Sequence, residues 1–217
     1  MLRVSNLKKS YATPQGSVDV LKGLSFDIAE GETVALMGES GCGKSTLLHV
    51  IAGLDTVNAG SIQINGAKIE ELDEAARANV RRYDVSLVFQ QFNLITSLTV
   101  EGNIGFEAKL AGRFDAAWQA SLVSRLGLEG LLDRYPEQLS GGQQQRVAIA
   151  RSFATKPSLI LADEPTGNLD EDTSDAVIAL AFDLVKETQS ALLMATHSRR
   201  LAEKADRILR LKGGHLE

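Results

Sequence analysis

The chain has 217 residues, of which 44% are hydrophobic and 24% charged, and its formal net charge is −5. This composition predicts an ordinary soluble globular protein with one full core, and no apolar run approaches the ~18 residues of a membrane span. The negative charge argues against a nucleic-acid partner, since such proteins usually carry a basic face. The single cysteine, Cys42, excludes an intrachain disulfide and suits a reducing cytoplasm, and the first residues show no signal peptide.

The first third of the chain predicts strands on either side of a glycine-rich loop. Alternating apolar and polar residues predict antiparallel strands over Leu2–Tyr11 and within 18–28, joined by a turn at Pro14-Gln15-Gly16. Further strands are predicted at Thr33–Met37, Gly60–Ile64 and Val85–Phe89, with helices at Leu47–Ala52 and from about Glu74 to Arg82.

The middle of the chain predicts a helical insert that Pro136 closes. One helix is expected from Thr99, as its cap, through Ala111, and a second over Phe114–Leu126. The apolar face of the second is expected to carry Phe114, Ala117, Trp118, Leu122 and Leu126.

The last third alternates between helices and apolar strands. Helices are predicted from Ser140 to about Thr155 and over Glu171–Thr188, and strands at Leu159–Ala162, Ala191–Ala195 and, as the final strand, Ile208–Leu211. This alternation predicts an α/β fold with a mostly parallel sheet covered on both faces.

The segment Gly38–Thr46, called here the phosphate loop, fits the pattern G-x-x-x-x-G-K-[ST] between a predicted strand and a predicted helix. Its glycines let successive N–H groups point inward and cradle phosphate oxygens at a helix N-terminus. Lys44 is placed to reach the β- and γ-phosphates, and Ser45 can offer its hydroxyl to Mg²⁺. The loop therefore predicts nucleotide binding.

A carboxylate pair, Asp163-Glu164, directly follows the apolar strand Leu159–Ala162. A buried strand that ends in two carboxylates needs a cation to meet them. Beside a phosphate loop, Asp163 is expected to hold Mg²⁺ and Glu164 to polarise the water that attacks the γ-phosphate.

The segment Leu139–Gln143, called here the signature segment, combines a serine cap with two glycines at a helix start, which is another natural anion seat. With the phosphate loop and the carboxylate pair, it resembles the ATP-binding subunit of ABC transporters, over essentially the whole chain. The resemblance implies a P-loop NTPase (RecA-like) α/β core with an antiparallel β edge subdomain and an inserted α-helical subdomain. It implies a single domain over 1–217, with the core and β subdomain in 1–90 and 146–217 and the helical subdomain in 91–145.

The same resemblance implies further site residues. Tyr11 stands where the family stacks an aromatic ring on adenine, Gln90 where a glutamine senses Mg²⁺ and the attacking water, and His197 where a histidine bonds the γ-phosphate. Asp170 ends the segment Asn168–Asp170, the aspartate loop, which contacts the opposite subunit in the family. The expected nucleotide contacts are Tyr11, Gly38, Ser40, Gly41, Cys42, Gly43, Lys44, Ser45, Thr46, Ser140, Gly141, Gly142, Gln143 and Asp170.

The family pairs two subunits head to tail, so that each ATP lies between the phosphate loop of one chain and the signature segment of the other. The resemblance therefore implies ATP and Mg²⁺ as ligands, and a second copy of the chain and a separately encoded membrane permease as partners. The expected location is the cytoplasmic face of the cell membrane, with membrane contact only through the permease.

Several functions fit this site. The sequence around Gln90 and Asp163 looks like the subfamily that serves lipoprotein release, macrolide or peptide export, and cell division. A cell-division type signalling subunit and an importer ATPase use the same ATP site. A soluble ATPase of DNA repair or translation is disfavoured, because the chain has no sustained heptads and one phosphate loop.

The permease is expected to insert a short helix into a groove beside Gln90. Four apolar residues in a loop-like stretch, Phe92, Leu94, Leu98 and Val100, are expected to line this groove.

Overall fold

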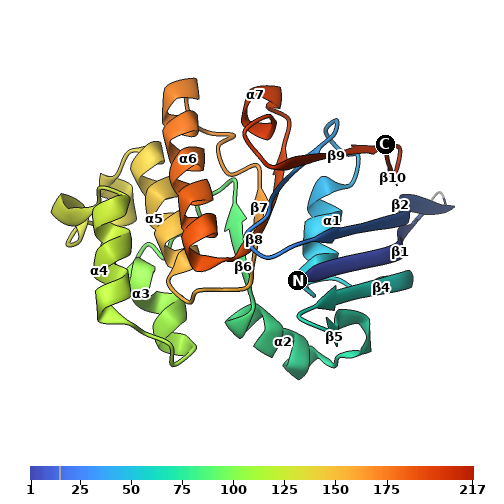
Figure 1. Ribbon diagram of the computed structural model, residues 1–217, viewed down its shortest axis with the longest axis horizontal. Helices are drawn as coiled ribbons and strands as arrows, with labels where there is room; N and C mark the ends of the chain where they lie inside the picture. The colour runs from blue at the N-terminus through green and yellow to red at the C-terminus, as the bar shows by residue number, and fades with distance from the viewer. Residues whose placement is uncertain (15) are drawn as a thin grey trace.

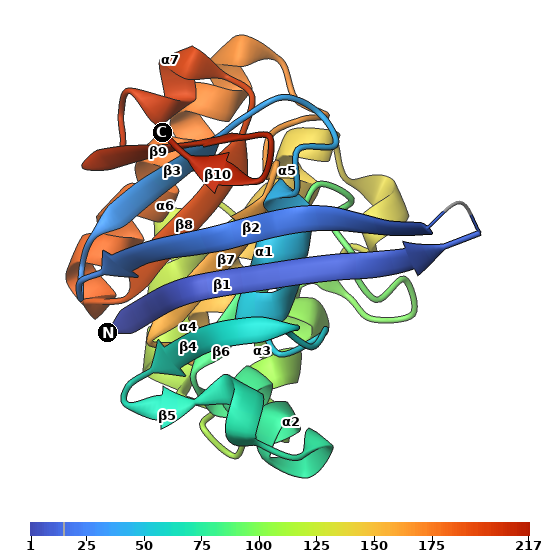
Figure 2. The ribbon, with the colours of Figure 1, turned by 90° about the vertical axis from the view of Figure 1, so that its right-hand side faces the viewer.

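The computed structural model describes residues 1–14 and 16–217, so Gln15 of the predicted turn lies outside the described residues. Within them, a four-stranded antiparallel sheet has the order β2-β1-β4-β5. Its strands are β1 (Leu2–Thr13), β2 (Gly16–Ile28), β4 (Ala59–Ile64) and β5 (Ala67–Lys68). Figure 2 shows this sheet lying across helix α1 (Lys44–Ile51), which carries the end of the phosphate loop.

The second sheet of the described residues has six strands in the order β10-β9-β3-β8-β7-β6. They are β3 (Thr33–Met37), β6 (Val85–Phe89), β7 (Leu159–Asp163), β8 (Ala191–Thr196), β9 (Arg207–Lys212) and β10 (His215–Leu216). Neighbouring strands from β6 to β9 are parallel, and β10 is antiparallel to β9. The prediction that the strand at Ile208–Leu211 is the last one is wrong, because Gly213 and Gly214 both adopt positive φ and turn the chain back into β10.

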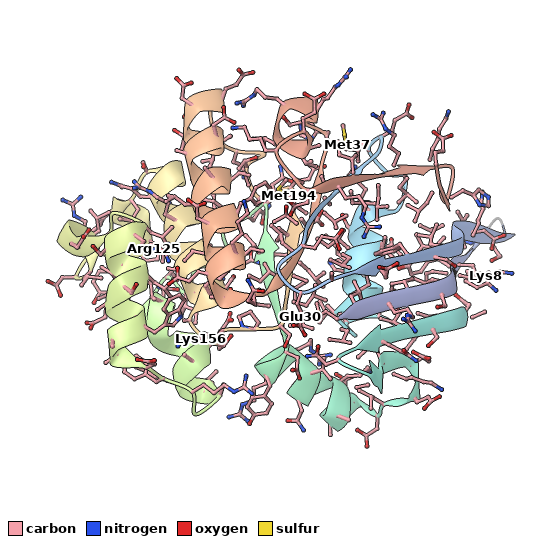
Figure 3. The ribbon with its side chains drawn as sticks, viewed as in Figure 1. Lys8, Glu30, Met37, Arg125, Lys156 and Met194 are labelled. Atoms are coloured by element: carbon pink, nitrogen blue, oxygen red, sulfur yellow. The ribbon has the colours of Figure 1, made fainter. Side chains whose placement is uncertain are left out.

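Successive side chains of the six-stranded sheet enter two separate cores. On β7, Leu159 and Leu161 pack with α1 and the antiparallel sheet, whereas Ile160 and Ala162 pack with the helices of the opposite face. Figure 1 shows this arrangement as α1 on one side of the sheet and α4, α5 and α6 on the other. In Figure 3, Met194 of β8 lies deep in the molecule with 1% of its surface exposed, whereas the exposed Lys8 of β1 projects outward. The predicted parallel sheet with two covered faces is therefore confirmed.

The α-helices after α1 follow capping residues. They are α2 (Glu74–Tyr83), α3 (Val100–Leu110), α4 (Ala116–Arg125), α5 (Gly141–Phe153), α6 (Glu171–Thr188) and the short α7 (Arg199–Ala202). Each from α2 to α7 begins after an Asp, Ser or Thr whose side chain accepts a backbone N–H of the first turn. Single 3-10 turns lie at Ile69–Glu71, Glu129–Leu131 and Pro136–Gln138. Helix α5 continues across the expected division between residues 145 and 146.

Two expectations about the helical insert are wrong. Helix α4 begins at Ala116 because Asp115 caps it, so Phe114 lies before the helix with 43% of its surface exposed, and Ala117 is also exposed. Gln119 takes the buried position instead. Val100 is fully buried in the core that α3 shares with α5, so it does not line a groove.

Candidate nucleotide-binding site

The phosphate loop links β3 to α1 and is held close to β9. A Cβ atom on Gly38 would lie 2.4 Å from the carbonyl oxygen of Leu211, so this position accepts only glycine without a shift of backbone. Gly38 and Cys42 face each other across the loop, since the same Cβ would lie 2.6 Å from the Cys42 Sγ. Cys42 is partly buried. The tight curl gathers Gly38–Thr46 at the N-terminus of α1, where N–H groups favour an anion.

Lys44 is the first residue of α1, and its side chain turns back into the loop. Its Nζ donates hydrogen bonds to the carbonyl oxygens of Gly38 at 2.9 Å and Glu39 at 3.1 Å. The same Nζ lies 3.8 Å from Oε1 of Glu164, and the residue is only 6% exposed. A buried ammonium group at the mouth of an N–H-lined loop is suited to bind phosphate oxygens.

Glu164 is brought to this loop by the ends of β7 and β8. Its N–H donates to the carbonyl oxygen of Ala195, and its Oε2 lies 3.3 Å from Nδ1 of His197, which follows β8. The backbone of Glu164 has a φ of 47°, in the left-handed region that costs a glutamate about 1–3 kcal/mol. Surrounding contacts hold this strained geometry, which aims the carboxylate between Lys44 and His197.

Gln90 lies at the same edge of the sheet. It follows β6, whose Phe89 pairs in register with Asp163 of β7. The Nδ2 of Asn168 donates to the Gln90 carbonyl oxygen at 3.0 Å, so the aspartate loop contacts the chain directly after β6. Asp170 caps α6 by accepting the Thr173 N–H, and this hydrogen bond lowers the pKa of the Asp170 carboxyl group.

The signature segment lies elsewhere on the molecule. Ser140 and Gln143 form a reciprocal capping box at the start of α5, with the Gln143 Oε1 accepting the Ser140 N–H at 2.9 Å. A Cβ on Gly142 would lie 2.6 Å from Cγ2 of Thr173 in α6, and one on Gly141 would lie 3.4 Å from Leu169. Helices α1 and α5 cover opposite faces of the sheet, so within one chain the phosphate loop and the signature segment begin helices on opposite faces.

Tyr11 reaches the site from the antiparallel sheet. Its ring is 39% exposed, and its hydroxyl donates to Oδ2 of Asp55 at 2.7 Å. Sequence reasoning singled out Tyr11 but missed Asp55, because no local pattern relates two residues on separate elements.

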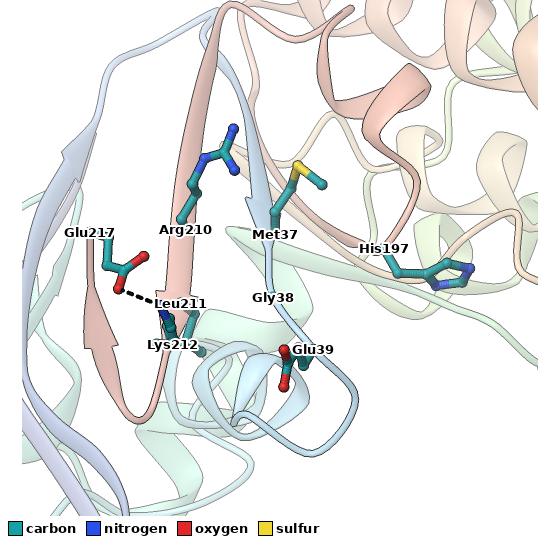
Figure 4. Close-up of a pocket in the computed structure, with 8 residues that line it drawn as sticks. All are labelled: Met37, Gly38, Glu39, His197, Arg210, Leu211, Lys212 and Glu217. Carbon is teal, nitrogen blue, oxygen red and sulfur yellow. Dashed lines mark ion pairs between the residues drawn. The ribbon is translucent and has the colours of Figure 1, made fainter.

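A cavity of about 390 Å³ adjoins the phosphate loop, as Figure 4 shows. Its wall includes Gly38, Glu39 and His197, together with Arg210 and Lys212 of β9. Lys212 also pairs with Glu217 at 3.3 Å. The two β9 cations were missed in the sequence, since exposed basic residues near a chain end carry no signal by themselves.

Comparisons with known proteins identify the class of this chain. The ABC transporter family matches residues 21–167. The chain is 44% identical to an uncharacterised ABC transporter ATP-binding protein, YbbA, of Escherichia coli, over 100% of this chain and 96% of that protein. It is 43% identical to the lipoprotein-releasing system ATP-binding protein LolD of Maricaulis maris, again over 100% of this chain and 96% of that protein. A solved dimer of the ATP-binding cassette MJ0796, bound to ADP and Pi, superposes with a TM-score of 0.90 at 37% identity, over 100% of this chain and 97% of that one.

The fold is thus the α/β fold of P-loop NTPase cassettes, as the sequence predicts. The chain belongs to the ABC transporter family, as an ATP-binding subunit.

Proposed function

We propose that this protein hydrolyses MgATP between two of its own copies and so drives a separately encoded membrane permease of the lipoprotein-release or export type. The observation that carries the chemistry is the convergence of Lys44, Glu164 and His197, which come from three different elements. The LolD relatives support the lipoprotein-release class, and the dimer of the MJ0796 cassette supports the pairing of two copies.

Each residue of the convergence has a distinct task in this proposal. Lys44 and the N–H groups of the phosphate loop bind the β- and γ-phosphates and offset their charge. Glu164 orients and polarises the attacking water, and His197 bonds the γ-phosphate from the β8 side. Gln90, which follows β6, senses Mg²⁺ and the attacking water in this proposal, and its carbonyl oxygen links it to the aspartate loop.

The residues expected to hold Mg²⁺ fit that ion chemically. Ser45 supplies a hydroxyl, Asp163 a carboxylate and Gln90 an amide oxygen, and oxygen donors are what Mg²⁺ prefers. The pairing of Phe89 with Asp163 places the last two donors at one end of adjacent strands. When bound there, the ion neutralises charge on the phosphates.

The signature segment acts in trans in this proposal, because it lies on the face opposite α1 within one chain. Ser140, Gly141, Gly142 and Gln143 then contact the nucleotide held by the partner copy, and the exposed Asp170 lies at the contact between copies. The division into a core (1–90 and 146–217) and a helical part (91–145) remains a prediction.

Mixing two inactive variants tests the trans arrangement. Lys44→Ala disables the phosphate loop and Ser140→Arg the signature segment, so each variant by itself is expected to be inactive. A head-to-tail mixed dimer has one site with both defects and one intact site. ATPase activity is therefore expected to reappear on mixing, because each mixed dimer holds one intact site.

The melting temperature of Ser140→Arg is the control, since loss of the helix cap costs only about 1 kcal/mol. Mixed dimers that form, by tagged co-purification, yet stay inactive would show that each site is built within one chain.

The partnership with a permease places this subunit at the cytoplasmic face of the membrane in our proposal. Among the described residues, no helix combines the length and apolar character needed to cross a bilayer. Phe92, Leu94 and Leu98 are partly buried, and Leu98 directly precedes α3 and its cap Thr99. Helix α3 also borders a cavity of about 430 Å³ that it shares with α2. We assign permease docking to this side of the helical insert.

Leu98→Asp is expected to abolish complex formation with the permease and the ATPase stimulation that accompanies it. The basal ATPase rate and melting temperature of the isolated subunit are expected to stay near wild type. Val18→Asp is the matched control, since Val18 is 51% exposed on β2, away from the insert. Pull-down and phosphate release measure both effects. If Leu98→Asp unfolds the isolated subunit, Leu98 is a core residue and the docking assignment fails.

A further inference from the structure

Three side chains from two separate parts of the chain form a cluster beside the phosphate loop, whose Thr46 also meets the Tyr11 hydroxyl. The Tyr11 hydroxyl donates to Oδ2 of Asp55 at 2.7 Å, and Nζ of Lys9 donates to Oδ1 of the same carboxylate at 2.7 Å. The Lys9 ammonium also lies 4.7 Å from the centroid of the Tyr11 ring, within the range of a cation–π contact. The ring of Tyr11 is thereby fixed at its tip by Asp55 and at one face by Lys9.

The backbone explains why these residues meet. Lys9 and Tyr11 are two positions apart on β1, so their side chains lie on one face of the strand. Helix α1 ends at Ile51, and the loop that follows is fastened along β1, since the Asn58 N–H donates to the Lys8 carbonyl oxygen at 3.0 Å. Asp55 lies in this loop and is positioned next to Lys9.

The charges of the cluster are balanced internally. Lys9 is only 7% exposed, and the Thr56 carbonyl oxygen accepts a second hydrogen bond from its ammonium group at 2.7 Å. Burial pushes the pKa of Asp55 upward, but hydrogen bonds from Lys9, Tyr11 and Thr56 outweigh it and leave that pKa below its ordinary value. Burial and the Asp55 carboxylate raise the pKa of Tyr11 and outweigh a hydrogen bond with Thr46 that lowers it.

We propose that Asp55, held by Lys9, is a positioning residue that orients the Tyr11 ring for the nucleobase. The inference rests on the proposed role of Tyr11 as the residue that stacks on adenine. A ring that is already oriented binds the base without losing further rotamer freedom, so the cluster raises affinity for the base-containing part of the ligand. Asp55 does not touch the phosphates in this arrangement.

Comparing ATP with inorganic tripolyphosphate separates the base from the phosphates. Binding is measured by calorimetry in EDTA, so that turnover does not interfere. The proteins compared are wild type, Asp55→Asn, Tyr11→Phe, the double variant of these two changes, and Tyr11→Ala. Asp55→Asn and Tyr11→Phe are each expected to weaken ATP binding about three- to tenfold. The double variant is expected to bind ATP no more weakly than the more impaired of the two single variants, because Tyr11→Phe removes and Asp55→Asn weakens the same hydrogen bond. Tripolyphosphate binding is expected to be unchanged throughout.

Two further measurements support the assignment. In steady-state assays the loss from Asp55→Asn is expected in KM rather than kcat. An absorbance titration is expected to show one tyrosine of Asp55→Asn ionising at a lower pH than in wild type. Asp55→Asn is expected to cause no such change in the Tyr11→Phe background. Asp115→Asn is the matched control, since Asp115 likewise pairs with a lysine, Lys156, but far from the phosphate loop. It is expected to leave ATP binding unchanged.

Four outcomes overturn the inference. An equal loss of tripolyphosphate binding in Asp55→Asn would show that Asp55 only maintains the loop. Additive losses of ATP affinity in the double variant would show that Tyr11 binds the base without Asp55. Normal ATP affinity of Asp55→Asn together with reduced affinity of Tyr11→Ala would show the same. If Tyr11→Ala itself binds ATP normally, the stacking role fails together with this inference, while the Lys44 and Glu164 assignments stand.

Discussion

Replacing Glu164 with glutamine is expected to reduce ATP hydrolysis by about 10²- to 10⁴-fold while ATP binding persists. Glutamine keeps the size of the side chain and the strained backbone position, but it can no longer act as a base. Lys44 remains in place, because its hydrogen bonds go to the carbonyl oxygens of Gly38 and Glu39. Since ATP joins the two copies in our proposal, the variant is expected to accumulate as an ATP-bound dimer.

Size-exclusion chromatography with and without MgATP, alongside phosphate release, measures this result. Glu171→Gln is the matched control, because Glu171 is an exposed carboxylate in the first turn of α6. It is expected to turn over ATP at nearly the wild-type rate and to remain largely monomeric. Near wild-type turnover by Glu164→Gln would remove Glu164 from the role of base, whatever the dimer does.

Lys44→Ala is expected to abolish ATP binding at ordinary nucleotide concentrations and to keep the protein monomeric. Truncating one partner of a buried charge pair costs about 2–5 kcal/mol. That cost corresponds to a Kd raised about 30- to several-thousand-fold. The loss is large here because Lys44 is 6% exposed and points into the phosphate loop.

Calorimetry with ATP in EDTA measures this loss directly. Lys8→Ala is the control, since Lys8 is exposed on β1, and it is expected to bind ATP normally. A melting temperature near wild type for Lys44→Ala separates lost binding from lost folding. Unchanged affinity in a folded Lys44→Ala protein would show that the loop binds phosphate through its N–H groups alone.

Local features of this fold could be predicted from the sequence, because they depend on neighbouring residues. Strand β7 is recognisable as an apolar run, and α6 was predicted with the bounds it has. Asp170 and Ser140 indicate helix starts in the sequence, because their side chains accept hydrogen bonds from backbone N–H groups three residues further on. The phosphate loop is equally local, since its glycines and Lys44 act within nine consecutive residues.

Two predictions failed, one at a local helix cap and one at a site of packing between distant segments. Phe114 fits a helical apolar stripe, but the cap at Asp115 leaves it outside the helix and exposed. Val100 resembles a loop residue in the sequence, yet it is fully buried against other helices. Sequence periodicity predicts which side of a helix is apolar. Whether that side is buried depends on the other helices and strands that pack against it.

The sequence by itself determined the order of the elements, the phosphate loop, the carboxylate pair and the family they resemble. Only the tertiary structure decided which of these residues meet. The parallel register of β3, β7 and β8 brings nitrogen atoms of Lys44 and His197 within 3.8 Å of the Glu164 carboxylate, and the loop after α1 places Asp55 against Tyr11. Helix caps and turns result from hydrogen bonds over a few residues, whereas strand order and loop docking result from burying apolar surface that is scattered along the whole chain.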